Sequence, residues 1–482
     1  MLHHDFARVL LVLATAGLAY ACDSSTEPPD TGVASLTVSQ TQVDLLLRDA
    51  TRLGVEARDA QGNLLSDRTA TFSSSHTDVA TVNEEGWVTG VGEGSATVTA
   101  TLEGMEASAT VTVTVLDFAS VSTNYHHTCA LMTDGSAYCW GYNIDGQLGI
   151  GTAEPGGCGT EQDVFSCRTK PVAVSGGHTF EMVSTGADHT CALTVDGDVY
   201  CWGDNEYGQL GNGTTVDSYT PARIETAAQF VMVAAGGTHT CAVTVDDEAF
   251  CWGSNSNNKL GDGTNVQQRN APVAVSGGLQ FEWVSAGGMS TCGIVAGGAA
   301  YCWGDAGYGQ LGTGSPTPAI ESTPQAVLGD HTYRWIGTDS YSTCAVTLAG
   351  EAYCWGRNHV GQLGDGTTTT RTEPVLVSGG LTYESFSVGA WHTCGVTAQG
   401  MLYCWGNNRD GQLGNGTIAD RTVPTLVSDD LVMQLVAAGG SHTCALTTTG
   451  SAYCWGQSYY GQLGHGSSST DALNPAPVIG SR

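Results

Sequence analysis

A pair of cysteines ten positions apart, repeated seven times, constrains the fold of this chain more than any other feature. The clearest copy, HTCALTVDGDVYCWGDNEYGQLGNGT, runs from residue 189 to residue 214. In every copy a Trp-Gly pair follows the second cysteine directly. The copies begin 50 to 52 residues apart, except for a first interval of 62. Such a period is typical of repeat architectures, in which each copy is one supersecondary unit that packs on its neighbours.

Each copy predicts a β-hairpin closed by a disulfide. In the clearest copy, Thr190–Val195 and Val199–Trp202 are two strand-like runs on either side of the turn signal Asp196-Gly197. The cysteines face each other only if the loop has an odd number of residues, which fits a type I turn followed by one left-handed residue. Gly occupies that last position in six copies, and Asp247 occupies it in the third. Opposed strand positions are close enough for a disulfide. The predicted hairpin pairs are Cys129–Cys139, Cys191–Cys201, Cys241–Cys251, Cys292–Cys302, Cys344–Cys354, Cys394–Cys404 and Cys444–Cys454.

Two further segments give each repeat four strands, the number in one propeller blade. One is an upstream run such as Phe180–Ser184, and the other is a proline-containing segment such as Lys170–Val174. Such proline segments precede copies two to seven, and an unmatched one lies at the C-terminus. The sequence therefore predicts a seven-bladed β-propeller over residues 117–482, closed by a C-terminal strand at 474–480 that joins the first blade. An insertion at 152–168 lengthens the first interval, and we expect a Cys158–Cys167 disulfide to pin it.

The repeats resemble those of the regulator-of-chromosome-condensation family over residues 117–482. The shared pattern includes His-Thr-Cys-Ala-Leu, the Trp-Gly pair and the Gly-Gln-Leu-Gly tetrapeptide. The resemblance implies a seven-bladed propeller. The paired cysteines and the insertion depart from the family pattern, and the cysteines suit an oxidising compartment. The eukaryotic founder is a guanine-nucleotide exchange factor that works on chromatin, and no residue here supports that activity.

The N-terminus predicts export. Residues 1–21 have the charge and short apolar run of a signal peptide, and Ala19-x-Ala21 fits signal cleavage. Of the 17 cysteines, the hairpins and the insertion use 16 and leave Cys22. Cys22 also resembles the modified residue of a bacterial lipoprotein box, although Leu18 sits one position too early. We therefore expect a lipidated Cys22, with an unprocessed or plainly cleaved signal as the alternative. The polar residues 22–32 would then be a tether.

Residues 33–116 contain no cysteine and predict a separate Ig-like β-sandwich of about seven short strands. The stretch ATFSSSHTDVATVNEEGWVTGVGEGSATVTATLEG, residues 70–104, resembles the bacterial Ig-like group 2 family. Members of that family act mainly as spacers or adhesive modules on cell surfaces. The whole chain is thus expected to be all-β, and to be a cell-envelope lipoprotein or an extracellular protein.

Charge and motifs point to binding and not to catalysis. The net charge of −31 argues against nucleic acid and against an anionic bilayer, so we expect membrane association only through a lipid anchor. The sequence shows no catalytic, cofactor or metal motif, and Gly-Gln-Leu-Gly reads as a turn between strands. Because the recurrent histidines fall in different blades, we expect them to have the same structural role in each. They are His127, His189, His239, His392 and His442.

Positions that vary between blades are the better candidates for function. Three residues before the first cysteine, consecutive copies carry Met289, Tyr341 and Trp391, which would form an apolar and aromatic patch if they faced solvent. The stapled insertion is a second candidate. We expect a monomeric interaction or adhesion module, with the Ig-like domain as spacer and a protein or surface glycan as partner. The alternatives are an inhibitor of a secreted enzyme, as one β-lactamase-inhibiting propeller of this repeat family is, and a polysaccharide-active enzyme with paired acids in the central channel.

Overall fold

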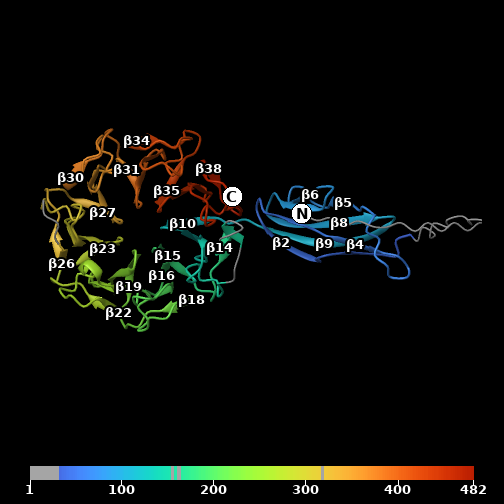
Figure 1. Ribbon diagram of the computed structural model, residues 1–482, viewed down its shortest axis with the longest axis horizontal. Coiled ribbons are helices and arrows are strands. Elements are labelled where there is room, and N and C mark those ends of the chain that lie inside the picture. The colour runs from blue at the N-terminus through green and yellow to red at the C-terminus, as the bar shows by residue number, and fades with distance from the viewer. Residues whose placement is uncertain (1–31, 154–156, 160–163, 316–319) are drawn as a thin grey trace, which may run out of the picture.

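The computed structural model describes residues 32–153, 157–159, 164–315 and 320–482, and these residues are almost entirely β-strand and loop. The predicted signal peptide and Cys22 lie outside the described residues. Figure 1 shows an elongated β-sandwich beside a ring of small sheets, with the C-terminus where the two meet. The all-β fold and its two parts are as expected from the sequence.

The sandwich is built from nine strands, where the sequence suggested about seven. Their bounds are β1 Ser35–Val38, β2 Gln42–Leu46, β3 Ala50–Arg52, β4 Val55–Arg58, β5 Thr71–Ser74, β6 Ala80–Val82, β7 Trp87–Gly90, β8 Gly94–Leu102 and β9 Met105–Thr114. Alternate residues of the long β8–β9 hairpin are buried, as expected for strands with one face on a core. Val98 and Val111 lie at the centre of that core with Val88 from β7.

The ring consists of seven sheets that follow one another in the chain between Phe118 and Pro477. Each sheet fits one propeller blade, and we number them blade 1 to blade 7 in chain order. In blades 2 to 7, four consecutive strands follow one another from the centre of the ring to its rim, and in blade 1 the order is β10, β11, β12, β14 (Figure 1). Blade 1 carries a fifth strand, β13 (Gly157–Gly159), on its outer edge. A short 3-10 helix, η1 (Ser256–Asn258), lies in blade 3.

The strands of the seven blades occupy four concentric positions. The innermost strands are β10 Phe118–Thr123, β15 Phe180–Thr185, β19 Phe230–Ala235, β23 Phe281–Ala286, β27 Tyr333–Thr338, β31 Tyr383–Val388 and β35 Met433–Ala438. The second are β11 His127–Met132, β16 His189–Thr194, β20 His239–Thr244, β24 Ser290–Val295, β28 Ser342–Thr347, β32 His392–Thr397 and β36 His442–Thr447. The third are β12 Ala137–Tyr142, β17 Val199–Gly203, β21 Ala249–Ser254, β25 Ala300–Asp305, β29 Ala352–Gly356, β33 Leu402–Gly406 and β37 Ala452–Gly456. The outer strands are β14 Val164–Ala173, β18 Ser218–Arg223, β22 Gln268–Ala274, β26 Ile320–Ala326, β30 Arg371–Leu376, β34 Arg421–Leu426 and β38 Ala472–Pro477.

The second and third strands of each blade form the hairpin that the cysteine spacing predicts. In blade 2, Cys191 lies directly opposite Cys201, with 4.1 Å between their Cα atoms, and the two are joined by a disulfide. The amide of Gly197 donates to the carbonyl of Thr194, and that of Thr194 donates to the carbonyl of Asp198, which closes a three-residue loop. Gly197 is left-handed, with φ of 81°, and Asp247 takes the same conformation in blade 3 with φ of 62°. All seven hairpin pairs and Cys158–Cys167 are disulfide-bonded.

The proline segments form the outer strand of the blade that precedes them, so the predicted place of the C-terminal strand is wrong. Strand β38 pairs with β37 of blade 7, and blade 1 already has an outer strand, β14, which contains Pro171. An edge position suits proline because it needs no amide donor. Each blade is therefore one contiguous piece of chain.

Ring closure relies on the same packing that joins every other pair of blades. Between blades 1 and 2, the Cys129–Cys139 disulfide and Leu148 pack against Phe180 and Trp202 of the next blade. Between blades 7 and 1 the equivalent cluster contains Cys444, Leu463, Phe118 and Trp140, extended by Val478. No exchanged strand is needed, because the last interface repeats the others.

The Gly-Gln-Leu-Gly tetrapeptide connects neighbouring blades by backbone contacts. The carbonyl of Gln147 accepts hydrogen bonds from Trp202 Nε1 at 2.9 Å and from Thr190 Oγ1 at 2.8 Å, both in the next blade. Gly149 lies against the Trp202 ring, where a Cβ atom would come within 2.7 Å of Nε1. The tetrapeptide is thus a contact between blades and not only a turn between strands.

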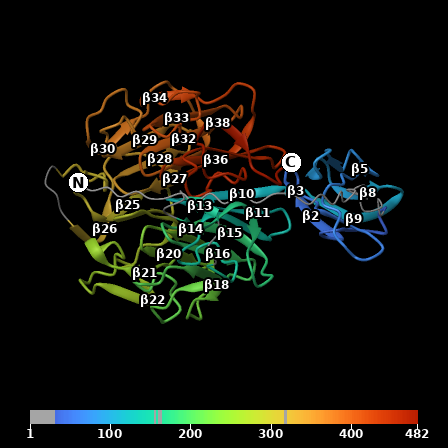
Figure 2. The same ribbon diagram turned by 45° about the vertical axis from the view of Figure 1, so that its right-hand side comes forward.

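The last residues of the chain also join the ring to the sandwich. Figure 2 shows the C-terminus beside β2 and β3 of the sandwich. The amide of Gly480 donates to the carbonyl of Leu47 at 2.7 Å, and its own carbonyl accepts from the amide of Leu116 at 2.6 Å. Arg48 donates to the carbonyl of Ser481, and Lys170 of blade 1 forms an ion pair with Asp49.

Candidate functional site

The loops that differ most between blades lie together at one end of the ring. Because the four strands of a blade are antiparallel, the loop from first to second strand and the loop from third to outer strand fall at the same end. In blade 1 these loops touch, since the amide of Tyr142 donates to the carbonyl of His126. We call this end the loop face, and we call the end with the hairpin turns, such as 195–197, the turn face.

Four side chains of blades 4, 5 and 6 form an arginine cluster on the loop face. The guanidinium carbon of Arg357 lies 4.6 Å from the ring centroid of Trp391, 5.3 Å from that of Tyr341 and 5.4 Å from that of Tyr308. Tyr341 also contacts the rings of Tyr308, at 5.1 Å, and of Trp391, at 6.2 Å. Cation–π contacts of this kind fix an arginine in place without neutralising its charge.

The structure therefore brings two of the three predicted patch residues together. Tyr341 and Trp391 are half-buried neighbours on consecutive blades. Met289 is half-buried at the equivalent position of blade 4, and neither it nor Tyr341 lines the pocket beside Trp391. Sequence reasoning missed Arg357, which directly follows the Trp-Gly pair of blade 5. The sequence feature that could have identified Arg357 is its positive charge, because the other copies carry Tyr, Asp, Ser, Asn or Gln at this position.

A second aromatic group, the insertion cluster, lies where blades 7 and 1 meet. The ring of Tyr460 is 4.4 Å from His126, 5.0 Å from Tyr142 and 5.7 Å from Phe165, measured between centroids. Phe165 belongs to the stapled insertion, and its ring also meets that of Tyr459. The described part of the insertion thus contributes an aromatic side chain to the loop face.

Three carboxylates lie close together on the loop face of blades 1 and 2. Burial, and then the charges of Asp188 and Asp204, raises the pKa of Asp145 to about 7. Burial, and then the charge of Asp204, raises the pKa of Asp188 to about 6. One side of the face is therefore acidic, while blades 5 and 6 carry Arg357 and Arg409.

The five recurrent histidines link the blades, in agreement with the structural role expected for them. Each is fully buried, and its Nε2 lies 2.7 to 3.0 Å from a threonine Oγ1 of the next blade. Thr190 Oγ1 donates its proton to the carbonyl of Gln147. The same Oγ1 therefore accepts a hydrogen bond from His127 Nε2–H. Nδ1 has no hydrogen-bond partner in any of the five among the described residues. Burial lowers the pKa of His127, His189, His392 and His442 to about 3, so these side chains are neutral.

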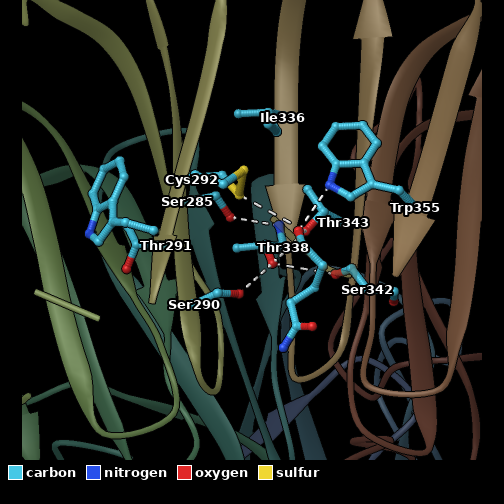
Figure 3. Close-up of a disulfide and its surroundings, with 12 residues drawn as sticks. Ser285, Ser290, Thr291, Cys292, Ile336, Thr338, Ser342, Thr343 and Trp355 are labelled. Atoms are coloured by element: carbon cyan, nitrogen blue, oxygen red, sulfur yellow. Dashed lines mark hydrogen bonds between the residues drawn. A yellow bond between two sulfur atoms is a disulfide. The ribbon is translucent and has the colours of Figure 1, made fainter. Parts of the chain in front are cut away.

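Blade 4 has Ser290 in place of the histidine, and a threonine completes the link. Figure 3 shows Thr338 between Ser290 and Thr343, beside the disulfide of Cys292. Thr338 Oγ1 lies 3.2 Å from Ser290 Oγ and 2.9 Å from Thr343 Oγ1. The serine side chain is too short to reach Thr343 as a histidine would, and the hydroxyl of Thr338, from the inner strand of blade 5, bridges the two.

In the described part of the chain, the pocket of the central channel is lined by a single carboxylate. One pocket of about 190 Å³ lies at the loop face end, and its lining includes Ser122, Ser285 and one carboxylate, Asp339. Burial raises the pKa of Asp339 to about 6. Tyr125 Oη lies 2.8 Å from Ser340 Oγ, which links blade 1 to blade 5. The enzyme hypothesis needs two facing acids, and this lining supplies one.

The described residues contain neither a metal-binding cluster nor a membrane-spanning helix. No group of three or more His, Cys, Asp or Glu side chains there is arranged to hold a metal ion. Nor does this part of the chain contain a helix with the length and apolar character of a membrane span.

Comparison with protein families agrees with both parts of the fold. The family model described as "Regulator of chromosome condensation (RCC1) repeat" matches residues 134–193, 196–243, 246–294, 349–396, 399–446 and 449–482. A second model of that repeat matches residues 118–147, 230–259, 384–412 and 434–462. The model "Bacterial Ig-like domain (group 2)" matches residues 32–115.

Curated relatives match about half of this chain. The ultraviolet-B receptor UVR8 of Arabidopsis thaliana is 32% identical over 240 residues, which are 50% of this chain and 41% of that protein. The human E3 ubiquitin-protein ligase HERC2 is 28% identical over 255 residues, 52% of this chain and 5% of that protein. The chain therefore spans less than half the length of these two relatives.

Solved structures show the same fold. Human WBSCR16 matches with a TM-score of 0.63 and 21% identity, over 71% of this chain and 94% of that chain. Yeast RCC1 (Prp20), solved with Kap60, matches with a TM-score of 0.61 and 20% identity, over 71% and 83%. The chain belongs to the family of regulator of chromosome condensation (RCC1) repeat proteins, and it carries a bacterial Ig-like domain (group 2) ahead of the repeats.

Proposed function

We propose that this chain is an exported, non-catalytic interaction or adhesion module that binds a protein through the loop face of its ring. The Ig-like domain would act as a spacer, and lipidated Cys22 would anchor the chain in the cell envelope. The eight disulfides and the group 2 Ig-like domain support an oxidising, extracytoplasmic location. RCC1 repeats in the relatives support a binding role.

The observation that carries the proposal is the arginine cluster. The framework positions of the ring are buried and repeat from blade to blade, whereas Tyr341, Arg357 and Trp391 each occur in one blade only. They meet at the loop face with Tyr308, whose position also carries a tyrosine in blades 2 and 7. Half-buried aromatic and arginine side chains are the residues most enriched in the energetic centres of protein interfaces. A rigid ring also holds them in place before binding, so little conformational entropy is lost.

An inhibitor of a secreted enzyme is the second candidate. The insertion cluster favours it, because Phe165 on a disulfide-pinned segment lies beside Tyr459 and Tyr460. A stapled aromatic projection next to an aromatic rim suits occlusion of a partner's cleft. An inhibitor would bind one enzyme and abolish its activity at equal molar amounts, whereas an adhesion module would leave the partner active.

The test is capture of the partner from envelope extract by cross-linking, with wild type and with the Tyr341→Ala/Trp391→Ala double variant. We expect the double variant to lose the captured protein at least tenfold, because two interface anchors are removed together. Leu348→Ala is the matched control, since Leu348 is 69% exposed in a hairpin turn of the turn face.

Melting temperature and the number of disulfides should be unchanged in all variants for the comparison to hold. Retention of the same partner by the double variant would place binding elsewhere, with the insertion cluster as the next position to change. Failure of the wild-type protein to capture any protein would contradict the proposal itself.

A further inference from the structure

We infer that the pocket between blades 5 and 6 binds a carboxylate group of the partner protein, with Arg357 as the group that holds it. This inference rests on the proposed function and names the chemistry of its partner. The occupant is an acidic segment of a protein, with an apolar side chain next to its Asp or Glu.

The pocket is open and its lining is mixed. It has a volume of about 540 Å³ and includes Arg357, His359, Trp391, Arg409, Asp410 and Ser441. Two guanidinium groups and one carboxylate give this lining a positive charge, in a chain whose net charge is −31. The rest of this acidic protein repels anions, so the positive pocket attracts an anion only at short range. The pocket is therefore suited to a specific contact with a bound anion and not to long-range attraction of anions.

Among the described residues, several arginines of the ring have an acidic partner, but Arg357 has none, like Arg409 beside the same pocket. Arg269 pairs with Asp262 at 2.8 Å, and Arg371 pairs with Asp365 at 2.7 Å. Within the described residues, no carboxylate lies within ion-pair distance of Arg357, and its buried Nε has no hydrogen-bond partner. A half-buried cation with an unused donor is costly unless a ligand satisfies it.

The aromatic rings prepare Arg357 for a planar anion. Contacts with Trp391 and Tyr341 hold the guanidinium in one orientation, and stacking leaves its edge free to donate. A carboxylate can accept two parallel hydrogen bonds from that edge, and such bidentate contacts are stronger than neutral hydrogen bonds. Arg409, unpaired among the described residues, supplies a second cation at the same pocket.

The apolar part of the lining indicates a protein segment. Trp391 and Val360 border the pocket beside the arginines, so an acid next to an aliphatic or aromatic side chain satisfies both halves of the site. A nucleic acid needs several phosphate contacts, and the negative charge of the chain opposes it. Lysine would not replace Arg357 well, because its ammonium group neither stacks flat nor presents two parallel donors.

The test is selection of a random dodecapeptide display library on the immobilised full chain, followed by titration of synthetic versions of the enriched peptides. We expect enriched peptides to contain Asp or Glu beside an apolar residue. Their affinity should fall at least tenfold with Arg357→Gln, fall nearly as far with Arg357→Lys, and fall tenfold when the peptide Glu is replaced by Gln. The matched control is Arg223→Gln, which removes an exposed arginine near the turn face.

The outcomes separate the inference from the proposed function. Peptides that bind wild type and Arg357→Gln equally would overturn the carboxylate pocket and leave a protein-binding ring intact. Enrichment of peptides without acidic residues would do the same. No enriched peptide, together with saturable binding of an oligogalacturonate probe, would assign the pocket to acidic glycans and overturn both. An unchanged melting temperature of Arg357→Gln establishes that any loss of binding is local.

Discussion

Removal of residues 473–482 is expected to lower the melting temperature by about 10 °C. The truncation deletes most of β38 with its ladder to β37, and it deletes Val478, which is fully buried between blades 7 and 1. The lost burial contributes about 2–3 kcal/mol and the lost backbone hydrogen bonds about 1 kcal/mol each, so the free energy of unfolding falls by roughly 5 kcal/mol or more. Thermal unfolding followed by circular dichroism measures the effect.

A chain that lacks only Arg482 is the matched control for the truncation. Arg482 forms an exposed ion pair with Asp117, and such pairs contribute little. The control should therefore melt within a few degrees of wild type. Equal melting temperatures for the wild-type protein and the longer truncation would refute the account of ring closure.

Acid is expected to destabilise the ring steeply, because burial keeps the five histidines neutral. The pKa of His189 is lowered to about 3 in the folded protein, while an unfolded histidine titrates at its ordinary value of 6.5. The folded pKa is thus depressed, and the stability that depends on the neutral form is present above pH 6.5 and is lost as pH falls toward 3. Each such group costs about 1.4 kcal/mol per pH unit over that window.

Buried carboxylates oppose part of this loss. The raised pKa values of Asp145, Asp188 and Asp339, between about 6 and 7, mean that the folded protein gains stability from their protonation as pH falls toward 3.8. The pKa of Asp204 is also raised by burial, so five histidines face four aspartates. The net free energy of unfolding should therefore fall by about 1 kcal/mol per pH unit or more between pH 6 and pH 4, and faster below.

Urea unfolding at several pH values between 7 and 4 measures this slope. His189→Gln keeps a donor toward Thr240 but cannot be protonated, so it should make the slope shallower by about 1.4 kcal/mol per pH unit. His76→Gln, at an exposed position of the sandwich, is the control and should leave the slope unchanged. A stability that stays flat from pH 7 to pH 4.5 would contradict the neutral histidine ring.

The hairpins were predictable because their signals are local. The ten-residue spacing of the cysteines and the Gly at each left-handed turn position determine strand pairing, loop length and disulfide partner at once. Asp247 shows how well the turn is specified, since it adopts the glycine conformation with φ of 62°. Side chains in a β-strand alternate between the two faces of the sheet. Once one pair of opposed residues is known, the pairing of the other residues in the hairpin follows.

The grouping of strands into blades was harder to predict. A proline segment lies between two hairpins, and its sequence fits the edge of either blade. The insertion separates Pro171 from the first hairpin in the sequence. For this reason the Pro171 segment is assigned to the second repeat from the sequence alone, although it belongs to blade 1. The contact from the carbonyl of Gln147 to Trp202 was also hidden, because a backbone acceptor leaves no side-chain signal.

The candidate site was predictable only in part, because it depends on neighbours from different blades. Comparing equivalent positions singled out Tyr341 and Trp391, which are in contact. The same comparison gave no weight to Arg357, which lines the pocket, and of the three residues it singled out only Trp391 lines the pocket. Sequence spacing places residues on a blade, but contacts between loops of adjacent blades depend on how far each side chain reaches across the interface.

The most direct test of the loop face is photo-cross-linking in the cells that produce the protein. Benzoylphenylalanine would replace Tyr308 or Tyr207 on the loop face, and Val195 or Leu348 on the turn face, all exposed side chains. The account predicts a cross-linked partner from Tyr308, and from neither Val195 nor Leu348. Cross-links that form from the turn-face positions and not from the loop-face positions would contradict it.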